Sequence, residues 1–309
     1  MKRPGEGPLS TYLVCGFLGA GKTTYILERL RDKSSRTAVL VNEFGTLGID
    51  GQIIRTKGGV DVVEMAGGCI CCSQRQGLVK SVTEIARDIR PDVLLIEPSG
   101  VAETSELLKA LSDDSLGGII SCDATITIID ATTFLDYSAP DSFGTFFLDQ
   151  VENADVVLIN KIDLVDPGLL VEIEARIDKL NPGAIVVRTD HCRDSGTLPQ
   201  TGRTRPIISH KKALEFDSVS FELQKPIPSG SLERFLCRLK EGAFGEILRA
   251  KGFVQIEGGA CVEVQTTPAQ VLIEPVECRT PPKMIFLGLG LKRSALEGYF
   301  ASGGISEDT

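Results

Sequence analysis

Tryptophan is absent from the chain, and histidine, methionine and tyrosine are scarce, with two, three and four residues. Basic residues are also outnumbered, because 33 Lys and Arg stand against 42 Asp and Glu, giving a net charge of −9. A protein whose affinity for nucleic acid depends on a broad basic face is therefore not expected. No apolar run reaches about 18 residues, so no membrane-spanning helix is expected either.

The first eight residues lack the apolar core and the small-residue cleavage site of a secretory signal, which predicts a cytoplasmic protein without membrane partners. The chain has nine cysteines, an odd number, and three of them lie within residues 69–72. In a reducing compartment, cysteines so close together indicate metal or redox chemistry more often than disulfide bonds. Isolated cysteines such as Cys15 and Cys261 are expected to be ordinary thiols.

The 309 residues are about twice a typical domain, so two domains are expected. In the first part, apolar β-branched runs alternate with helical patterns, such as those of residues 22–32 and 74–89. The predicted strands are residues 12–15, 37–42, 61–64, 92–97, 125–130, 155–160 and 184–188. Buried runs that alternate with helices predict an α/β domain, over residues 1–189, with a mostly parallel sheet covered on both faces.

The pattern changes after residue 189. Residues 190–212 are polar and contain Gly, Pro and Ser, which is typical of a linker. Helices are predicted at residues 231–239 and 291–301. The strands predicted beyond the linker are residues 217–223, 252–257, 261–265, 270–273 and 283–289. This order predicts a smaller α+β domain over residues 213–303, followed by a tail at residues 304–309.

A phosphate-binding loop is the strongest motif. Residues 16–23 match G-x-x-x-x-G-K-[ST] and stand between a predicted strand and a predicted helix, as a P-loop requires. Backbone N–H groups of such a loop surround phosphate oxygens, and the helix N-terminus adds positive potential. We expect Lys22 to reach the β- and γ-phosphates and the Thr23 hydroxyl to bind Mg²⁺. The nucleotide-binding candidates of this loop are Gly16, Gly19, Ala20, Gly21, Lys22, Thr23 and Thr24.

The predicted strand 92–97 ends in a carboxylate, Glu97. A P-loop protein needs a second acid beside its magnesium, usually at such a strand end. Glu97 is therefore the candidate for that role and, with Lys22, a candidate catalytic residue, although a carboxylate at an ordinary strand end is the alternative. Gly100, three residues on, is expected to present its backbone N–H to the γ-phosphate.

The nucleotide base is indicated by residues 160–163, Asn-Lys-Ile-Asp, which follow a predicted buried strand. This is the N-K-x-D pattern of guanine-nucleotide-binding proteins. The Asp163 carboxylate can accept two hydrogen bonds from guanine, and adenine lacks that donor pair. The stem of Lys161 can lie over the ring, and Asn160 can brace the loop. GTP and GDP are thus the expected nucleotides.

A cysteine cluster is the third motif. In an extended segment Cys69 and Cys71 point to the same side, and Cys72 joins them if the chain turns at the next helix. Three thiolates make a soft-donor site that suits Zn²⁺, with Co²⁺, Cu⁺ and Fe²⁺ as alternatives. A redox pair and a set of small buried residues are the other interpretations. Because the cluster lies between residues 42–45 and Glu97, where P-loop switches sense the γ-phosphate, GTP hydrolysis could control the grip on a metal.

Together these motifs resemble the CobW family of P-loop GTPases, relatives of the urease and hydrogenase nickel-insertion GTPases. The resemblance is strong over residues 11–189 and weaker over residues 214–300, where segments 248–253 and 284–288 carry it. The segments of the first part that carry it are residues 16–24, 42–45 (Asn-Glu-Phe-Gly), 67–72 (Gly-Gly-Cys-Ile-Cys-Cys), 97–100 (Glu-Pro-Ser-Gly) and 160–163.

The resemblance implies magnesium-dependent GTP hydrolysis by a protein that handles zinc or another transition metal, such as cobalt, iron or nickel. It implies a metallochaperone or metal insertase that holds its cargo at Cys69, Cys71 and Cys72, with Glu43 as a further ligand. A client metalloprotein would dock on the C-terminal domain, and a nucleotide-dependent homodimer is expected. The alternatives are a maturation factor for a metal- or cobalamin-dependent enzyme, with only a regulatory metal, and a P-loop kinase.

Two departures from the family pattern are visible. Thr46 stands where many members have an acidic residue, so one further metal or switch ligand is missing. The chain also lacks the His-rich stretches of many members, which argues against metal storage. Of its two histidines, His191 precedes Cys192, and this pair is either a source of one metal ligand or a plain loop feature; the other is His210.

Overall fold

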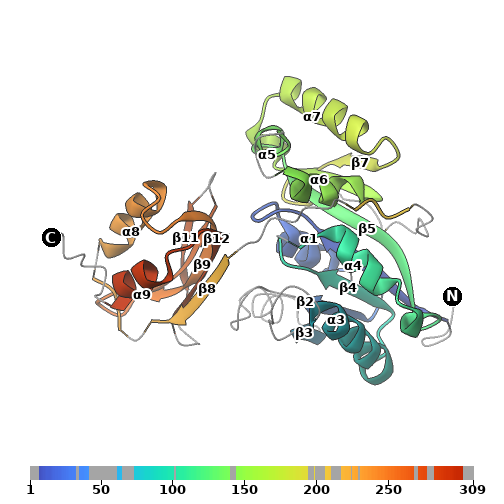
Figure 1. Cartoon of the computed structure of the whole chain (residues 1–309), viewed down its shortest axis with the longest axis horizontal. Coiled ribbons are helices and arrows are strands. Elements are labelled where there is room, and N and C mark those ends of the chain that lie inside the picture. The colour runs from blue at the N-terminus through green and yellow to red at the C-terminus, as the bar shows by residue number, and fades with distance from the viewer. Residues whose placement is uncertain are drawn as a thin grey trace. The chain divides into compact units, whose positions relative to one another are not determined.

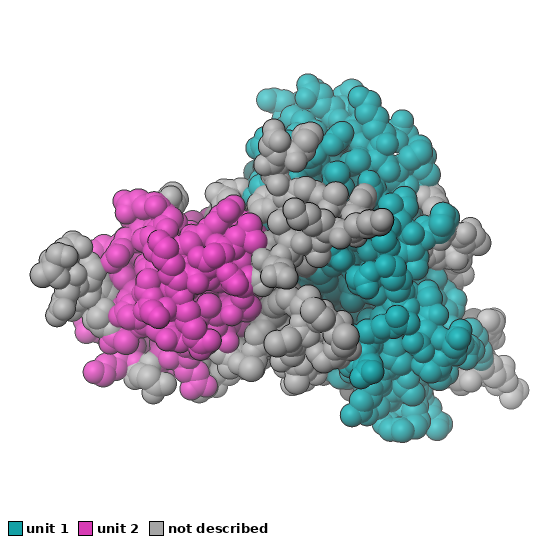
Figure 2. Space-filling view, viewed as in Figure 1, with its two compact units in different colours: residues 1–43, 50–214 teal, residues 44–49, 215–309 magenta. Residues whose placement is uncertain are grey.

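The computed structural model describes residues 7–32, 35–41, 61–64, 73–100, 102–139, 144–193, 198, 206–209, 217–223, 225–228, 230–267, 271–276 and 282–301. They divide into two compact units: unit 1 contains the described residues up to 209, and unit 2 those from 217 onward (Figure 2). No helix of the described ranges is both long and apolar enough to cross a membrane.

Unit 1 is built on a parallel sheet whose described strands number seven, in the order β3-β2-β4-β1-β5-β6-β7 (Figure 1). The predicted α/β architecture is therefore confirmed. Its strands are β1 (Leu9–Cys15), β2 (Thr37–Val41), β3 (Asp61–Glu64), β4 (Val93–Glu97), β5 (Ile120–Asp130), β6 (Val156–Asn160) and β7 (Ile185–Arg188). Its helices are α1 (Lys22–Arg29), α3 (Ser73–Glu84), η1 (Ile85–Ile89), α4 (Thr104–Leu111), η2 (Asp114–Leu116), α5 (Phe134–Tyr137), α6 (Gly144–Glu152), η3 (Ile162–Leu164) and α7 (Pro167–Leu180).

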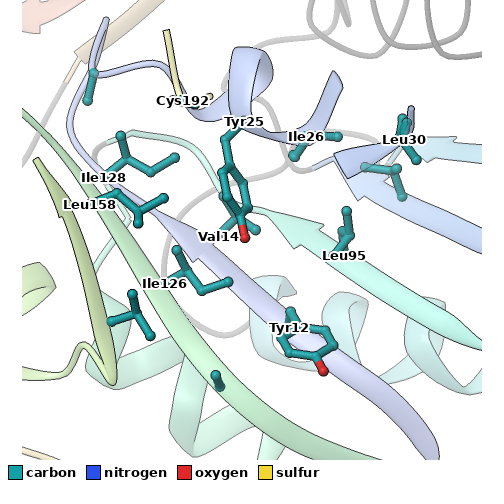
Figure 3. Close-up of a cluster of buried hydrophobic side chains, with 14 of the residues drawn as sticks. Tyr12, Val14, Tyr25, Ile26, Leu30, Leu95, Ile126, Ile128, Leu158 and Cys192 are labelled. Atoms are coloured by element: carbon teal, nitrogen blue, oxygen red, sulfur yellow. The ribbon is translucent and has the colours of Figure 1, made fainter. Parts of the chain in front are cut away.

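Helices cover both faces of this sheet, which explains why its strands read as continuous apolar runs. On one face, Tyr12 and Val14 of β1 pack with Tyr25 and Ile26 of α1 (Figure 3). The alternate β1 residue Leu13 points to the other face, where its cluster includes residues of α3 and α4. The period of two along a strand thus supplies two cores from one segment.

The sequence pattern places the start of two strands too late. β1 begins at Leu9 rather than at residue 12, and β5 begins at Ile120 rather than at residue 125. The two strands pair in parallel from Leu9 opposite Ile120, with a register shift between Thr11 and Tyr12. The early part of β5 is polar and half-buried, so it lacks the apolar run by which buried strands are recognised.

Unit 2 has an antiparallel sheet whose described strands run in the order β11-β10-β9-β12-β8, covered by α8 and α9. The predicted smaller α+β domain is confirmed. Phe235 of α8, Phe286 of β12 and Phe300 of α9 meet with ring centroids 5.0 to 6.0 Å apart. The elements are β8 (Asp217–Glu222), α8 (Ser231–Lys240), β9 (Glu246–Gln255), β10 (Cys261–Thr266), β11 (Val271–Val276), β12 (Lys283–Leu289) and α9 (Arg293–Ala301).

Two expectations for unit 2 are wrong. β9 begins at Glu246, six residues before the predicted start at Gly252. Gly252 lies inside the strand because β12 approaches so closely that a Cβ there would be 2.0 Å from the Lys283 carbonyl oxygen. Cys261 of β10 is disulfide-bonded, so the expectation that it is an ordinary thiol is wrong.

Candidate nucleotide-binding site

The candidate site lies at one edge of the parallel sheet of unit 1. Because β1, β4, β5 and β6 run in the same direction, their carboxyl ends meet at that edge, where ligands of open α/β sheets bind. Cys15, Glu97, Asp130 and Asn160 are the last residues of these strands. The sheet therefore brings together the loops that carry three of the sequence motifs.

The loop between β1 and α1 needs glycine at two positions. Gly16 and Gly21 have φ angles of 141° and 114°, which side-chain-bearing residues rarely adopt. A Cβ on Gly16 would lie 2.3 Å from the Ile128 carbonyl oxygen, and one on Gly21 would lie 2.5 Å from Nδ2 of Asn160. The loop is thus a tight turn pressed onto β5 and onto the residue that ends β6.

Lys22 begins α1 and is 5% exposed. Its ammonium group donates hydrogen bonds to the carbonyl oxygens of Gly16 at 2.8 Å and of Phe17 at 3.2 Å. The charge is therefore held against the loop itself, at the start of a helix whose N-terminus favours anions.

The side chains of Thr23 and Glu97 bring two oxygen atoms side by side. The Thr23 hydroxyl donates a hydrogen bond of 3.0 Å to Oε1 of Glu97, whose side chain is 3% exposed at the end of β4. A hydroxyl beside a buried carboxylate is a donor set that suits Mg²⁺, which prefers oxygen ligands. The residues present thus fit the predicted magnesium site.

The loop that follows β4 lies on the P-loop. A Cβ on Gly100 would be 2.6 Å from Cδ2 of Leu18 and 2.9 Å from Nζ of Lys22. The same Cβ would lie 2.9 Å from the backbone nitrogen of Leu18, which cannot move aside as a side chain can, so glycine is needed for this approach. The approach places the Gly100 backbone next to the lysine expected to meet the γ-phosphate.

Asn160 links the P-loop to the loop after β7. Its side chain is 3% exposed, and Nδ2 donates to the Ala20 carbonyl oxygen at 2.8 Å. Its Oδ1 accepts a hydrogen bond of 3.1 Å from the backbone N–H of Cys192. One buried amide therefore braces two loops, and rotation of Asn160 would loosen both.

Cys192 lies in the core of the site rather than on a surface loop. Its side chain belongs to the cluster beneath α1 (Figure 3), with Sγ 3.6 Å from the Gly21 carbonyl oxygen. Burial raises the pKa of this thiol to about 12, which disfavours the thiolate that a metal would need. Cys192 therefore packs against the P-loop, and its buried thiol is poorly suited to bind a metal.

Lys161 and Asp163, the two candidates for contact with the base, follow directly after β6. Lys161 has a φ of 62°, and its Nζ is 2.5 Å from Oδ2 of Asp130, the last residue of β5. Asp163 is exposed, and one of its carboxylate oxygens, a carboxylate oxygen of Asp190 and a ring nitrogen of His191 all lie within 4.8 Å of one another. A hydrogen bond with His191 is the main cause that lowers the pKa of Asp190. Asp163 is thus accessible, as a residue that reads a base must be.

The predicted zinc ligands cannot be placed in the same way. Glu43, Cys69, Cys71 and Cys72 lie outside the described residues, as do Thr46 and His210. Their expected roles remain predictions. β3 and α3, which flank the cysteine segment along the chain, are described.

Comparison with known proteins gives a match over most of the chain. The sequence profile of the CobW/HypB/UreG nucleotide-binding domain matches residues 10–188, and that of the cobalamin synthesis protein cobW C-terminal domain matches residues 216–302. Zinc chaperone CobW of Sinorhizobium sp is 28% identical over 325 residues, which cover 90% of this chain and 88% of that protein. Zinc-regulated GTPase metalloprotein activator 1 of Dictyostelium discoideum is 31% identical over 311 residues, covering 82% of this chain and 64% of that protein. The crystal structure of zinc-bound YjiA GTPase from E. coli aligns with a TM-score of 0.48 at 21% identity, over 96% of this chain and 98% of that one.

Proposed function

Because the chain belongs to the CobW family of P-loop GTPases, we propose that it couples GTP binding and hydrolysis to the handling of zinc. As a member of this family the chain is a GTPase. The observation that carries the nucleotide part of the proposal is the contact between Thr23 and Glu97, since it joins the P-loop to the strand that leads into the loop beside Lys22.

The hydrolysis step follows from the residues around that contact. Lys22 would release the carbonyl oxygens of Gly16 and Phe17 and neutralise charge on the β- and γ-phosphates. Thr23 and Glu97 would hold Mg²⁺, which neutralises phosphate charge in such sites. The Gly100 backbone would meet the γ-phosphate side. These groups position and stabilise charge, which is most of what phosphoryl transfer requires.

Guanine would be read by Asp163, with Asn160 holding the loop against Ala20. The ion pair with Asp130 fixes the Lys161 head group, so the stem of Lys161 is available to lie along the base. The carboxylate accepts two hydrogen bonds from guanine, and adenine would leave it unpaired. This difference selects guanine over adenine.

We propose that zinc binds Cys69, Cys71 and Cys72, with Glu43 as a further ligand. The names of the relatives, zinc chaperone and zinc-regulated GTPase metalloprotein activator, support zinc over the other metals. Strand register supports coupling between the zinc site and the nucleotide site. Glu64, at the end of β3, and Glu97, at the end of β4, both pair with Val41 of β2, so the two strand ends lie at the same level of the sheet. Cys69 follows Glu64 by five residues, so chain connectivity keeps Cys69 within about 18 Å of that strand end.

Delivery of the metal to a client metalloprotein through residues 213–303 would complete the cycle, and a nucleotide-dependent homodimer is part of the proposal. A second candidate is an activator for which zinc is only regulatory, which the relative named as a metalloprotein activator favours. Transfer of radioactive zinc from this protein to an apo-client in the presence of GTP would distinguish them, because the activator would stimulate its client without transferring metal.

GTP hydrolysis by metal-stripped protein, at fixed Mg²⁺ with Zn²⁺ titrated, tests the coupling. We expect a rate that changes until about one equivalent of zinc is bound. A protein in which Cys69, Cys71 and Cys72 are replaced by serine should hydrolyse GTP without responding to zinc. A flat rate in the unaltered protein would contradict coupling, and no hydrolysis at any zinc level would contradict the GTPase assignment.

A further inference from the structure

Helix α6 carries a buried side-chain amide that the chemistry above does not use. Gln150 is 3% exposed. Its Nε2 donates hydrogen bonds to the carbonyl oxygens of Gly100 at 3.1 Å and of Ala102 at 3.3 Å. Both acceptors lie in the loop between β4 and α4, about fifty residues earlier in the chain. The amide therefore holds the loop that follows Glu97.

The neighbouring residue anchors the far end of the same loop. Asp149 is 2% exposed, and its Oδ2 accepts a hydrogen bond of 3.1 Å from the backbone N–H of Ser105, in the first turn of α4. Helix α6 is in turn fixed to the sheet, because the Thr127 hydroxyl of β5 donates to the Gln150 carbonyl oxygen at 2.6 Å. Figure 1 shows α6 beside α4. The loop is thus held by one helix, which is itself hydrogen-bonded to the sheet.

The same helix contacts the P-loop. Phe147, one turn before Gln150, packs edge-on against Phe17 with 5.7 Å between the ring centroids. Phe17 is a P-loop residue whose carbonyl oxygen accepts a hydrogen bond from Lys22. Helix α6 therefore contacts both loops between which the γ-phosphate would lie, and Gln150 is its polar contact with the second of them.

We propose that Gln150 is a positioning residue for GTP hydrolysis. By holding the Gly100 and Ala102 carbonyl groups, it keeps the Gly100 backbone over Lys22, where its N–H is ready to meet the γ-phosphate. This inference rests on GTP being the substrate. GDP has no γ-phosphate, so its binding does not depend on the hydrogen bonds from Gln150 to Gly100 and Ala102. Loss of these two hydrogen bonds therefore lowers the rate of hydrolysis and leaves GDP affinity unchanged.

The test is steady-state kinetics of Gln150→Met, which keeps the length of the side chain and removes both donors. We expect kcat to fall about 10- to 100-fold, since a small misplacement of a reacting group costs up to about 100-fold. KM and the GDP dissociation constant should change less than about threefold. The matched control is Gln265→Met, which makes the same change in β10 of unit 2, where Nε2 of Gln265 donates a hydrogen bond of 2.7 Å to Oε1 of Glu263. It should keep kcat.

An unchanged kcat in Gln150→Met, or an equal loss of kcat and GDP affinity, would overturn the proposal. If the unaltered chain hydrolyses no GTP, it is the proposed function that fails. Should Gln150→Met not fold, amide hydrogen exchange of the unaltered protein decides. A peptide covering residues 100–105 should be protected more by a slowly hydrolysed GTP analogue than by GDP, and equal protection would overturn the proposal.

Discussion

The hydroxyl of Thr23 and the carboxylate of Glu97 lie 3.0 Å apart across 74 residues of sequence. If they share a magnesium ion, removing either ligand should damage hydrolysis more than folding. We expect Glu97→Gln to lower the hydrolysis rate about 100-fold or more, because a metal supplies several kcal/mol of charge stabilisation and 1.36 kcal/mol is tenfold. Glu174→Gln, which removes an exposed carboxylate paired with Arg188, is the control and should keep the rate. Full activity of Glu97→Gln would exclude Glu97 from the metal site.

Asp163 should determine the base. In Asp163→Asn the side chain presents an amide N–H group to the N–H groups of guanine. The hydrogen bonds from guanine to a charged carboxylate are then lost, so GDP affinity should fall about 100-fold. Xanthosine diphosphate, which has a carbonyl at that position, should bind better than it does to the unaltered protein. Fluorescent-nucleotide titration measures both. Asp166→Asn, which changes a nearby exposed Asp without a side-chain cap bond, should do neither.

Gly252 tests the packing of unit 2. Because a Cβ there would meet the Lys283 carbonyl oxygen at 2.0 Å, Gly252→Ala should force β9 from β12 and lower the free energy of unfolding by about 1–3 kcal/mol. Gly298→Ala on α9 has nothing within 4 Å of its Cβ, so it should instead add about 0.5–1 kcal/mol. Urea unfolding followed by circular dichroism measures the two. Equal effects of the two substitutions would contradict the observed strand contact.

Two buried thiols should make the protein sensitive to alkali. Burial raises the pKa of Cys15 and of Cys192 from 9.0 to about 12. Because the folded-state pKa is raised, the stabilisation is fully present below pH 9 and is lost as the pH rises from 9 to 12. At pH 10 we expect a loss of about 1 kcal/mol for each thiol, since one pKa unit is 1.36 kcal/mol.

Urea unfolding at pH 8 and pH 10 measures this loss. Cys15→Ala should reduce the difference between the two pH values by about half, although the substitution itself lowers stability at both. Cys237→Ala is the control, because Cys237 is exposed and should leave the difference unchanged. The same pH dependence in all three proteins would show that the buried thiols are not its cause.

The predictable parts of the site depend on neighbours in sequence. The P-loop and the Asn160–Asp163 segment follow buried strands, and turn glycines and strand ends are local properties. The contact of Gln150 with Gly100 is different, since it joins residues fifty apart and its only local trace is a polar pair in a helix of mixed composition. The two interpretations of the His191–Cys192 pair, a metal ligand or a plain loop feature, do not include a buried thiol, because the burial of Cys192 depends on Asn160, thirty-two residues away.

In the fold, too, features set by neighbouring residues are predictable, and features set by contacts between distant residues are not. Apolar β-branched runs identify the strands of the parallel sheet, but not the polar first half of β5, whose pairing with β1 is a tertiary contact. Gly252 looks like the start of a strand because glycine usually marks a boundary, whereas here it admits the neighbouring strand. The strand β11 extends to Val276, three residues past the predicted end at residue 273, and Pro275 is tolerated in it because β11 lies at the edge of the described sheet.

The central claim, that nucleotide state controls the hold on zinc, is tested most directly by measuring zinc affinity in two nucleotide states. The dissociation constant for Zn²⁺ should be determined by competition with a chelating dye, with Mg²⁺ present and either GDP or a slowly hydrolysed GTP analogue bound. The account predicts affinities that differ about 5- to 150-fold, the range of ordinary coupling free energies, and a difference that disappears when Cys69, Cys71 and Cys72 are replaced by serine. Equal zinc affinities in the two states would contradict it.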